Sequence, residues 1–63
     1  MANYSWRYRL GRGEWKPCTM LGALRAPYDH AERLIATGAL EIERRVDGNW
    51  ISVAKINMDG LNR

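Results

Sequence analysis

Two alternating runs on either side of residues 47–48 form the clearest pattern of apolar and polar positions in the chain. Residues 40–46 read LEIERRV, residues 49–56 read NWISVAKI, and Asp47-Gly48 lies between them. This dipeptide suits the positive backbone φ angles of a two-residue turn, so the segment is predicted to be a β-hairpin. Counting outward from the turn gives the cross-strand pairs Val46–Asn49, Arg44–Ile51, Ile42–Val53 and Leu40–Lys55.

This pairing gives the hairpin two different faces. The apolar face is predicted to be the floor of the core, because alternate residues of a strand point to the same side. It carries Leu40, Ile42, Val46, Ile51 and Val53, with Arg44, Asn49 and Lys55 among them. The opposite face is predicted to carry Glu41, Glu43, Arg45, Trp50, Ser52, Ala54 and Ile56.

A second hairpin is predicted near the start of the chain. Residues 4–10 alternate strictly and are rich in aromatic side chains, which is typical of a strand. Tyr4, Trp6, Tyr8 and Leu10 share one side, with Ser5, Arg7 and Arg9 on the other. Gly11-Arg12-Gly13 is predicted to be a turn, and residues 14–20 a return strand at a sheet edge, because Pro17 has no N–H donor. The loop length, and so the side that Trp15 takes, is left open.

One helix is predicted between the hairpins, over residues 27–37, with residues 21–26 as a connector. Pro27 suits the first position of a helix, and Gly38 suits a left-handed C-terminal stop. Ala31, Leu34 and Ile35 would form its buried stripe. The predicted order is β-β-α-β-β, an α+β fold with an antiparallel four-stranded sheet and one helix packed on one face.

The chain has 63 residues, which we interpret as one small domain with a frayed tail at 57–63. A domain of this size buries only about 60% of its unfolded surface, so its core is marginal. The single cysteine, Cys18, excludes an internal disulfide, and no cluster of ligand residues indicates a metal. Association with another chain is therefore the expected supplement, with homodimer and monomer both left open.

The sequence gives little support for catalysis. Cys18 has no evident base partner, and His30, the only histidine, is expected to be solvated near the helix start. Gly11-Arg12-Gly13 lacks the third glycine and the following helix of a phosphate-binding loop. We expect no enzyme activity, no catalytic residues, no cofactor and no metal. No apolar run reaches the roughly 18 residues of a membrane span, so a cytoplasmic location is expected.

Two binding functions are compatible with these patterns. The first is a small regulatory or inhibitory protein that docks on a larger protein or protein complex, since tryptophan and arginine often dominate protein interfaces. Its expected contact residues are Trp50, Arg45, Ile56, Arg7 and Arg9.

The alternative is a DNA- or RNA-binding protein that uses the basic, aromatic first hairpin. The net charge is +3, and the excess of basic residues lies in residues 1–26. The expected phosphate contacts are Arg7, Arg9, Arg12 and Lys16. Trp6, Tyr8 or Trp15 would stack on unpaired bases if their side of the sheet is open.

Residues 31–45, followed by Asp47-Gly48, resemble the end of a winged-helix domain, where a helix leads into the wing hairpin. The similarity covers less than a third of the chain. A winged helix also contains a helix-turn-helix upstream, whereas the upstream half here is predicted to form strands. No functional residues are assigned from this resemblance.

Overall fold

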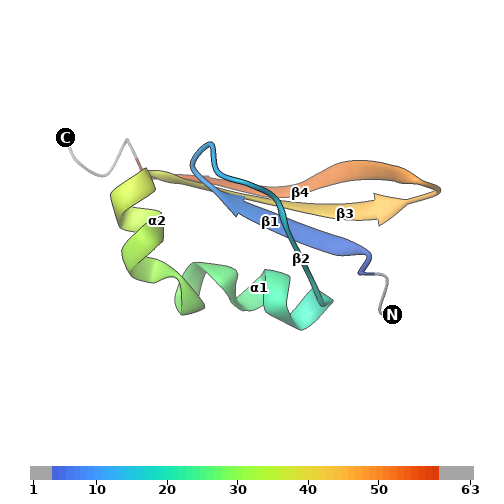
Figure 1. Cartoon of the computed structure of the whole chain (residues 1–63), viewed down its shortest axis with the longest axis horizontal. Helices are drawn as coiled ribbons and strands as arrows, with labels where there is room; N and C mark the ends of the chain where they lie inside the picture. The colour runs from blue at the N-terminus through green and yellow to red at the C-terminus, as the bar shows by residue number, and fades with distance from the viewer. Residues whose placement is uncertain (1–3, 59–63) are drawn as a thin grey trace.

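The computed structural model describes residues 4–58 and shows a four-stranded antiparallel sheet with two helices on one side (Figure 1). Along the chain, the elements are β1 (Trp6–Leu10), β2 (Lys16–Cys18), α1 (Met20–Asp29), α2 (Ala31–Thr37), β3 (Ala39–Val46) and β4 (Asn49–Asn57). The spatial order of the strands is β2-β1-β3-β4. The α+β class and the antiparallel sheet were predicted correctly.

The predicted order β-β-α-β-β is wrong in its helical part, since two helices connect the hairpins. Residues 21–26 were expected to be a connector, but they lie in α1. This helix begins after Thr19, whose Oγ1 accepts a hydrogen bond from the Gly22 N–H at 3.0 Å. Such a cap satisfies one of the free donors at a helix N-terminus. Pro27 therefore lies inside α1 and not at a first position.

A break at His30 separates α1 from α2. His30 has φ −121° and ψ 32°, which is not helical, and it ends α1 three residues after Pro27. The predicted stop at Gly38 is confirmed, because this residue has a φ of 82° and ends α2 in the left-handed conformation.

The core lies between the helices and one face of the sheet. Its buried residues are Leu10, Ala23, Ala26, Leu34, Leu40 and Ile42. Of the predicted stripe, only Leu34 is buried; Ala31 and Ile35 are exposed. The buried residues of α1 are instead Ala23 and Ala26, whose small side chains allow the helix to lie close to the sheet.

The second hairpin confirms the predicted turn but not the full register. Val46–Asn49 and Arg44–Ile51 are paired as expected. An irregularity between Ile42 and Glu43 then leaves Val53 as an extra residue, so Ile42 faces Ala54 and Leu40 faces Ile56. The predicted pairs Ile42–Val53 and Leu40–Lys55 are wrong. A bulge of one residue moves all later side chains of its strand to the other face.

The end of the described chain is also more ordered than expected. Asn57, which was placed in a frayed tail at 57–63, is the last residue of β4. The N–H of Met58 donates to the Gly38 carbonyl at 2.8 Å, and Met58 packs against the core. Residues 59–63 lie outside the described residues.

Candidate functional site

The two helices cover one face of the sheet, and the other face is the candidate site (Figure 1). We call it the open face and define it by the side chains of Arg7, Arg9, Trp15, Glu41, Glu43, Arg45, Trp50 and Lys55. Their positions follow from the register, because each of these strand residues alternates with residues that face the helices. Trp15 belongs to this group through its contacts with the arginines of β1.

Arg7 lies between two tryptophan rings near the middle of the open face. Its Cζ atom is 4.3 Å from the ring centroid of Trp15 and 4.2 Å from that of Trp50. Its Nε and Nη2 atoms donate to Oε1 of Glu43 at 2.8 and 2.5 Å. We call this arrangement the Trp15–Arg7–Trp50 stack. Each contact of a cation with an aromatic ring contributes about 0.5–2 kcal/mol, depending on how far it is shielded from water.

A second ion pair runs parallel to the first. Arg9 Nη2 lies 3.2 Å from both carboxylate oxygens of Glu41, and the Arg9 Cζ is 4.6 Å from the Trp15 ring centroid. Within residues 4–58, the Arg9 Nε is buried and has no hydrogen-bond partner. Each of these β1 arginines is thus paired with a glutamate of β3, which balances charge locally, and the arginine contacts restrain both tryptophans.

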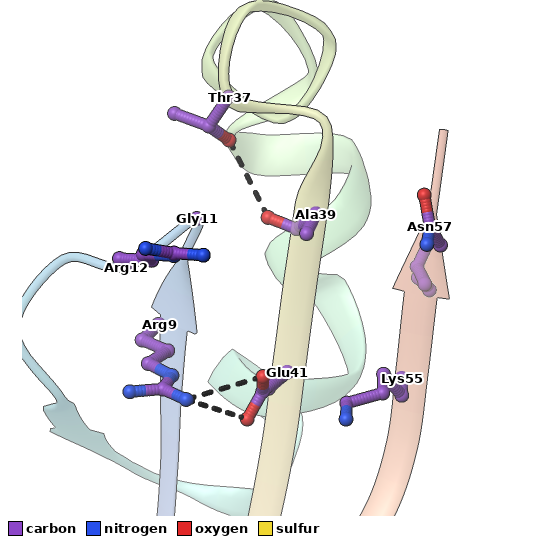
Figure 2. Close-up of a pocket in the computed structure, with 9 residues that line it drawn as sticks. Arg9, Gly11, Arg12, Thr37, Ala39, Glu41, Lys55 and Asn57 are labelled. Carbon is purple, nitrogen blue, oxygen red and sulfur yellow. Dashed lines mark hydrogen bonds and ion pairs between the residues drawn. The ribbon is translucent and has the colours of Figure 1, made fainter. Parts of the chain in front are cut away.

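A hollow of about 510 Å³ lies at the end of the open face near α2 (Figure 2). We call it the basic hollow. Arg9, Arg12 and Lys55 contribute cations to it from β1, the following turn and β4. Glu41 supplies the only carboxylate among the described lining residues. The sum of these charges is positive even after Arg9 has paired with Glu41.

Backbone contacts fix the rim of the basic hollow. Gly11 has a φ of +59°, and a Cβ atom at this position would lie 3.1 Å from the Cβ of Thr37. The Gly11 N–H donates to the Ala39 carbonyl at 2.8 Å. Thr37 donates its hydroxyl to the Arg33 carbonyl at 2.7 Å. The turn after β1 is therefore held close to the end of α2.

The structure brings together most of the residues predicted for protein docking. Arg7, Arg9, Arg45 and Trp50 share the open face, and the Arg45 Cζ lies 5.9 Å from the Trp50 ring centroid. Ile56 does not belong with them. It pairs with Leu40 and packs against the core, so its predicted position beside Trp50 is wrong because of the bulge in β4.

The residues predicted for nucleic-acid contact are divided between the two faces. Lys16 pairs with Tyr8 on the side of the sheet that faces the helices, whereas Arg7 and Arg9 lie on the open face. Trp6 and Tyr8 pack against the core, so they are not available for stacking on bases. Arg12 is exposed at the basic hollow.

Sequence reasoning missed two members of the open face. Trp15 was left unassigned because the length of the loop after β1 could not be predicted. The pairing of Trp6 with Cys18, together with the contacts of Trp15 with Arg7 and Arg9, settles its side. Lys55 was placed toward the core because the alternation of β4 shows no sign of a bulge. Its pairing with Glu41 puts it on the open face.

The residues considered for catalysis have structural roles. His30 was expected to be solvated, but it is half-buried, and its ring stacks on Tyr8 with the centroids 5.2 Å apart. Its Nε2 lies 3.0 Å from the Tyr8 hydroxyl. Cys18 packs against the core, and burial raises the pKa of its thiol, which disfavours the nucleophilic thiolate.

Neither the remaining structural features nor the comparisons with known proteins assign a function to the chain. Across residues 4–58, no group of three or more His, Cys, Asp or Glu side chains is placed to hold a metal ion. In the same range, neither helix has the length and apolar character needed to cross a membrane. The chain has no significant match to a protein family model, a curated protein or a solved structure.

Proposed function

We propose that this chain is a small, non-enzymatic regulatory or inhibitory protein that docks on a larger protein or protein complex through its open face. The Trp15–Arg7–Trp50 stack carries this proposal, because it places two tryptophans and an arginine on the side of the sheet that the helices leave uncovered. These residue types are enriched among the positions that dominate binding energies at protein interfaces.

The ion pairs of the open face support the same function. Association costs roughly 0.5–1.5 kcal/mol for each flexible side chain that becomes immobilised. Arg7 and Arg9 are already held by Glu43 and Glu41, and both contact Trp15. Much of this ordering cost therefore falls on folding and not on binding, which favours a rigid docking surface.

Capture of a partner by the native chain and two variants tests the docking function. Trp50→Ala removes one ring of the stack, whereas Tyr28→Ala changes a side chain on α1 that is 82% exposed. We expect both variants to fold, and only Trp50→Ala to lose capture in a pull-down. Equal capture by the two variants would contradict docking through the open face. An unfolded Trp50→Ala variant would show that Trp50 is needed for the core.

Nucleic-acid binding is the second candidate, favoured by the excess of cations at the basic hollow. Phosphate contacts release counterions, so the affinity should fall steeply between low and moderate salt. A gel-shift series with random-sequence DNA and RNA at increasing salt tests this. Absence of a shift even at low salt would eliminate this candidate and leave protein docking.

A further inference from the structure

The basic hollow contains positive charge that the rest of the open face does not neutralise. Glu41 is held by Arg9, whose Nη2 reaches both of its carboxylate oxygens. Arg12 and Lys55 make no ion pair with any residue in 4–58. Figure 2 shows Arg12 on the same side of the hollow as Arg9 and Lys55 on the opposite side, with Glu41 between the arginines and Lys55. Two cations are thus available to an incoming anion.

The hollow is already formed in the free chain. Its rim is held by the hydrogen bond from the Gly11 N–H to the Ala39 carbonyl, and Thr37 lies so near that a Cβ atom at residue 11 would be 3.1 Å from its Cβ. Its volume of about 510 Å³ exceeds what a single ion needs and can take a whole side chain. Pockets for small ligands commonly measure about 300–1,000 Å³, and the volume of this hollow falls within that range.

We propose that the basic hollow binds a carboxylate side chain from an acidic segment of the docked partner. Arg12 and Lys55 provide the charge-assisted hydrogen bonds to that carboxylate, while the Trp15–Arg7–Trp50 stack contacts neighbouring residues of the same segment. This role depends on the docking function proposed above and specifies its partner: the surface that meets the open face is acidic at one end.

The charge pattern favours an acidic protein segment over a nucleic-acid strand. Glu43 and Glu41 each lie opposite an arginine, so carboxylates interrupt the row of cations on the open face. A strand with a charge on every phosphate would have to pass these carboxylates as it crosses the sheet. A single acidic side chain reaches Arg12 and Lys55 at the end of the face without doing so.

A titration monitored by NMR tests the site with defined probes. The ¹⁵N-labelled full chain is titrated at low salt with a blocked tetraglutamate peptide, a blocked tetraglutamine peptide and oligo-dT. We expect saturable shifts for the tetraglutamate peptide at the amides of Gly11, Arg12, Thr37 and Lys55, and none for tetraglutamine. Tighter binding of oligo-dT at these amides would overturn the inference and identify a phosphate site.

Two charge-matched double variants complete the test. Arg12→Gln with Lys55→Gln removes both free cations of the hollow, and we expect a loss of about tenfold in affinity for tetraglutamate. Arg25→Gln with Arg44→Gln changes the net charge equally but lies outside the hollow, so its affinity should stay within about twofold of the native value. Equal losses in both double variants would overturn the site.

The result is separable from that of the docking test. Capture that depends on Trp50, without binding of tetraglutamate, would remove the acidic segment and retain docking through the open face. Binding of tetraglutamate at the hollow, without capture that depends on Trp50, would retain the carboxylate site and remove docking through the Trp15–Arg7–Trp50 stack.

Discussion

Arg7 shows how single residues organise the open face. Its guanidinium is planar, so it can lie between the rings of Trp15 and Trp50 while its edge donates two hydrogen bonds to Glu43. The side chain of Arg7 is only 25% exposed, and that of Glu43 only 19%. At this burial, loss of one partner leaves the polar group of the other partly buried without a hydrogen-bond partner, which is unfavourable.

Replacing Arg7 should therefore destabilise the fold as well as the surface. We expect Arg7→Gln to lower the free energy of unfolding by about 1–3 kcal/mol, because it leaves the Glu43 carboxylate partly buried without its cation. Urea unfolding measures the loss, with Arg44→Gln on the other face as the control. Arg44 is exposed, so its replacement should change the stability by less than about 0.5 kcal/mol. Equal losses would contradict the central role of Arg7.

The thiol of Cys18 gives a second prediction at the scale of one residue. Burial raises the pKa of Cys18 from its ordinary value of 9.0, so the folded chain holds the thiol proton more tightly than the unfolded chain does. Stability should consequently be complete below about pH 9 and decline as the pH rises further, since the unfolded chain then ionises first. Alkylation by iodoacetamide at pH 8 should be slower in the folded chain than in urea. Equal rates would contradict the burial.

At the scale of elements, the sequence predicted those features that depend on local chemistry. The turn at Asp47-Gly48 has the expected positive φ angles, 51° and 81°, and the two pairs nearest to it are correct. The bulge beyond them could not be predicted, because residues 51–54 read Ile-Ser-Val-Ala and their alternation fits either register. The positions of Ile56 and Lys55 were wrong for this reason alone.

The helices show a different limit of sequence reasoning. The side of α1 that contacts the sheet consists of Ala23 and Ala26, whereas its outer side has the larger apolar residues Leu21, Leu24 and Tyr28. A search for a stripe of large apolar side chains cannot find a helix that is buried through its alanines. Pro27 was then taken as the helix start, although the helix is capped by Thr19 and begins at Met20, seven residues before Pro27.

The cap at Thr19 can be tested directly. Thr19→Ala removes the oxygen that accepts the Gly22 N–H, and the free energy of unfolding should fall by about 0.5–2 kcal/mol. Thr19→Ser keeps a hydroxyl oxygen and should retain most of the stability. Thermal unfolding followed by circular dichroism measures both variants. If Thr19→Ala were as stable as Thr19→Ser, α1 would not depend on this cap.

The turn after β1 gives a matched pair of glycine variants. Ala at residue 11 or at residue 48 would have to adopt a positive φ, at a cost of about 1–2 kcal/mol. Gly11→Ala adds a close contact with Thr37, whereas a Cβ at residue 48 meets nothing within 4 Å. We therefore expect Gly11→Ala to be the more destabilising variant in chemical unfolding. The reverse order would show that the rim of the basic hollow is loosely held.

At the scale of the whole molecule, the number and placement of helices decide which surface is free. Two short helices cover one face of the four strands (Figure 1). The other face has the Trp15–Arg7–Trp50 stack at its middle and the basic hollow at one end. The chain also exposes apolar side chains on its helices, with Tyr28 of α1 at 82% and Ile35 of α2 at 67% exposure. Docking through the open face therefore has a real competitor on the opposite side of the molecule.

Site-specific photo-cross-linking distinguishes the two surfaces most directly. A photoreactive residue replaces Ser52, which is exposed and pairs with Glu43 on the open face, or Ile35, which is 67% exposed on α2. We expect a covalent adduct with a larger protein from position 52 and none from position 35. An adduct from position 35 alone would contradict docking through the open face.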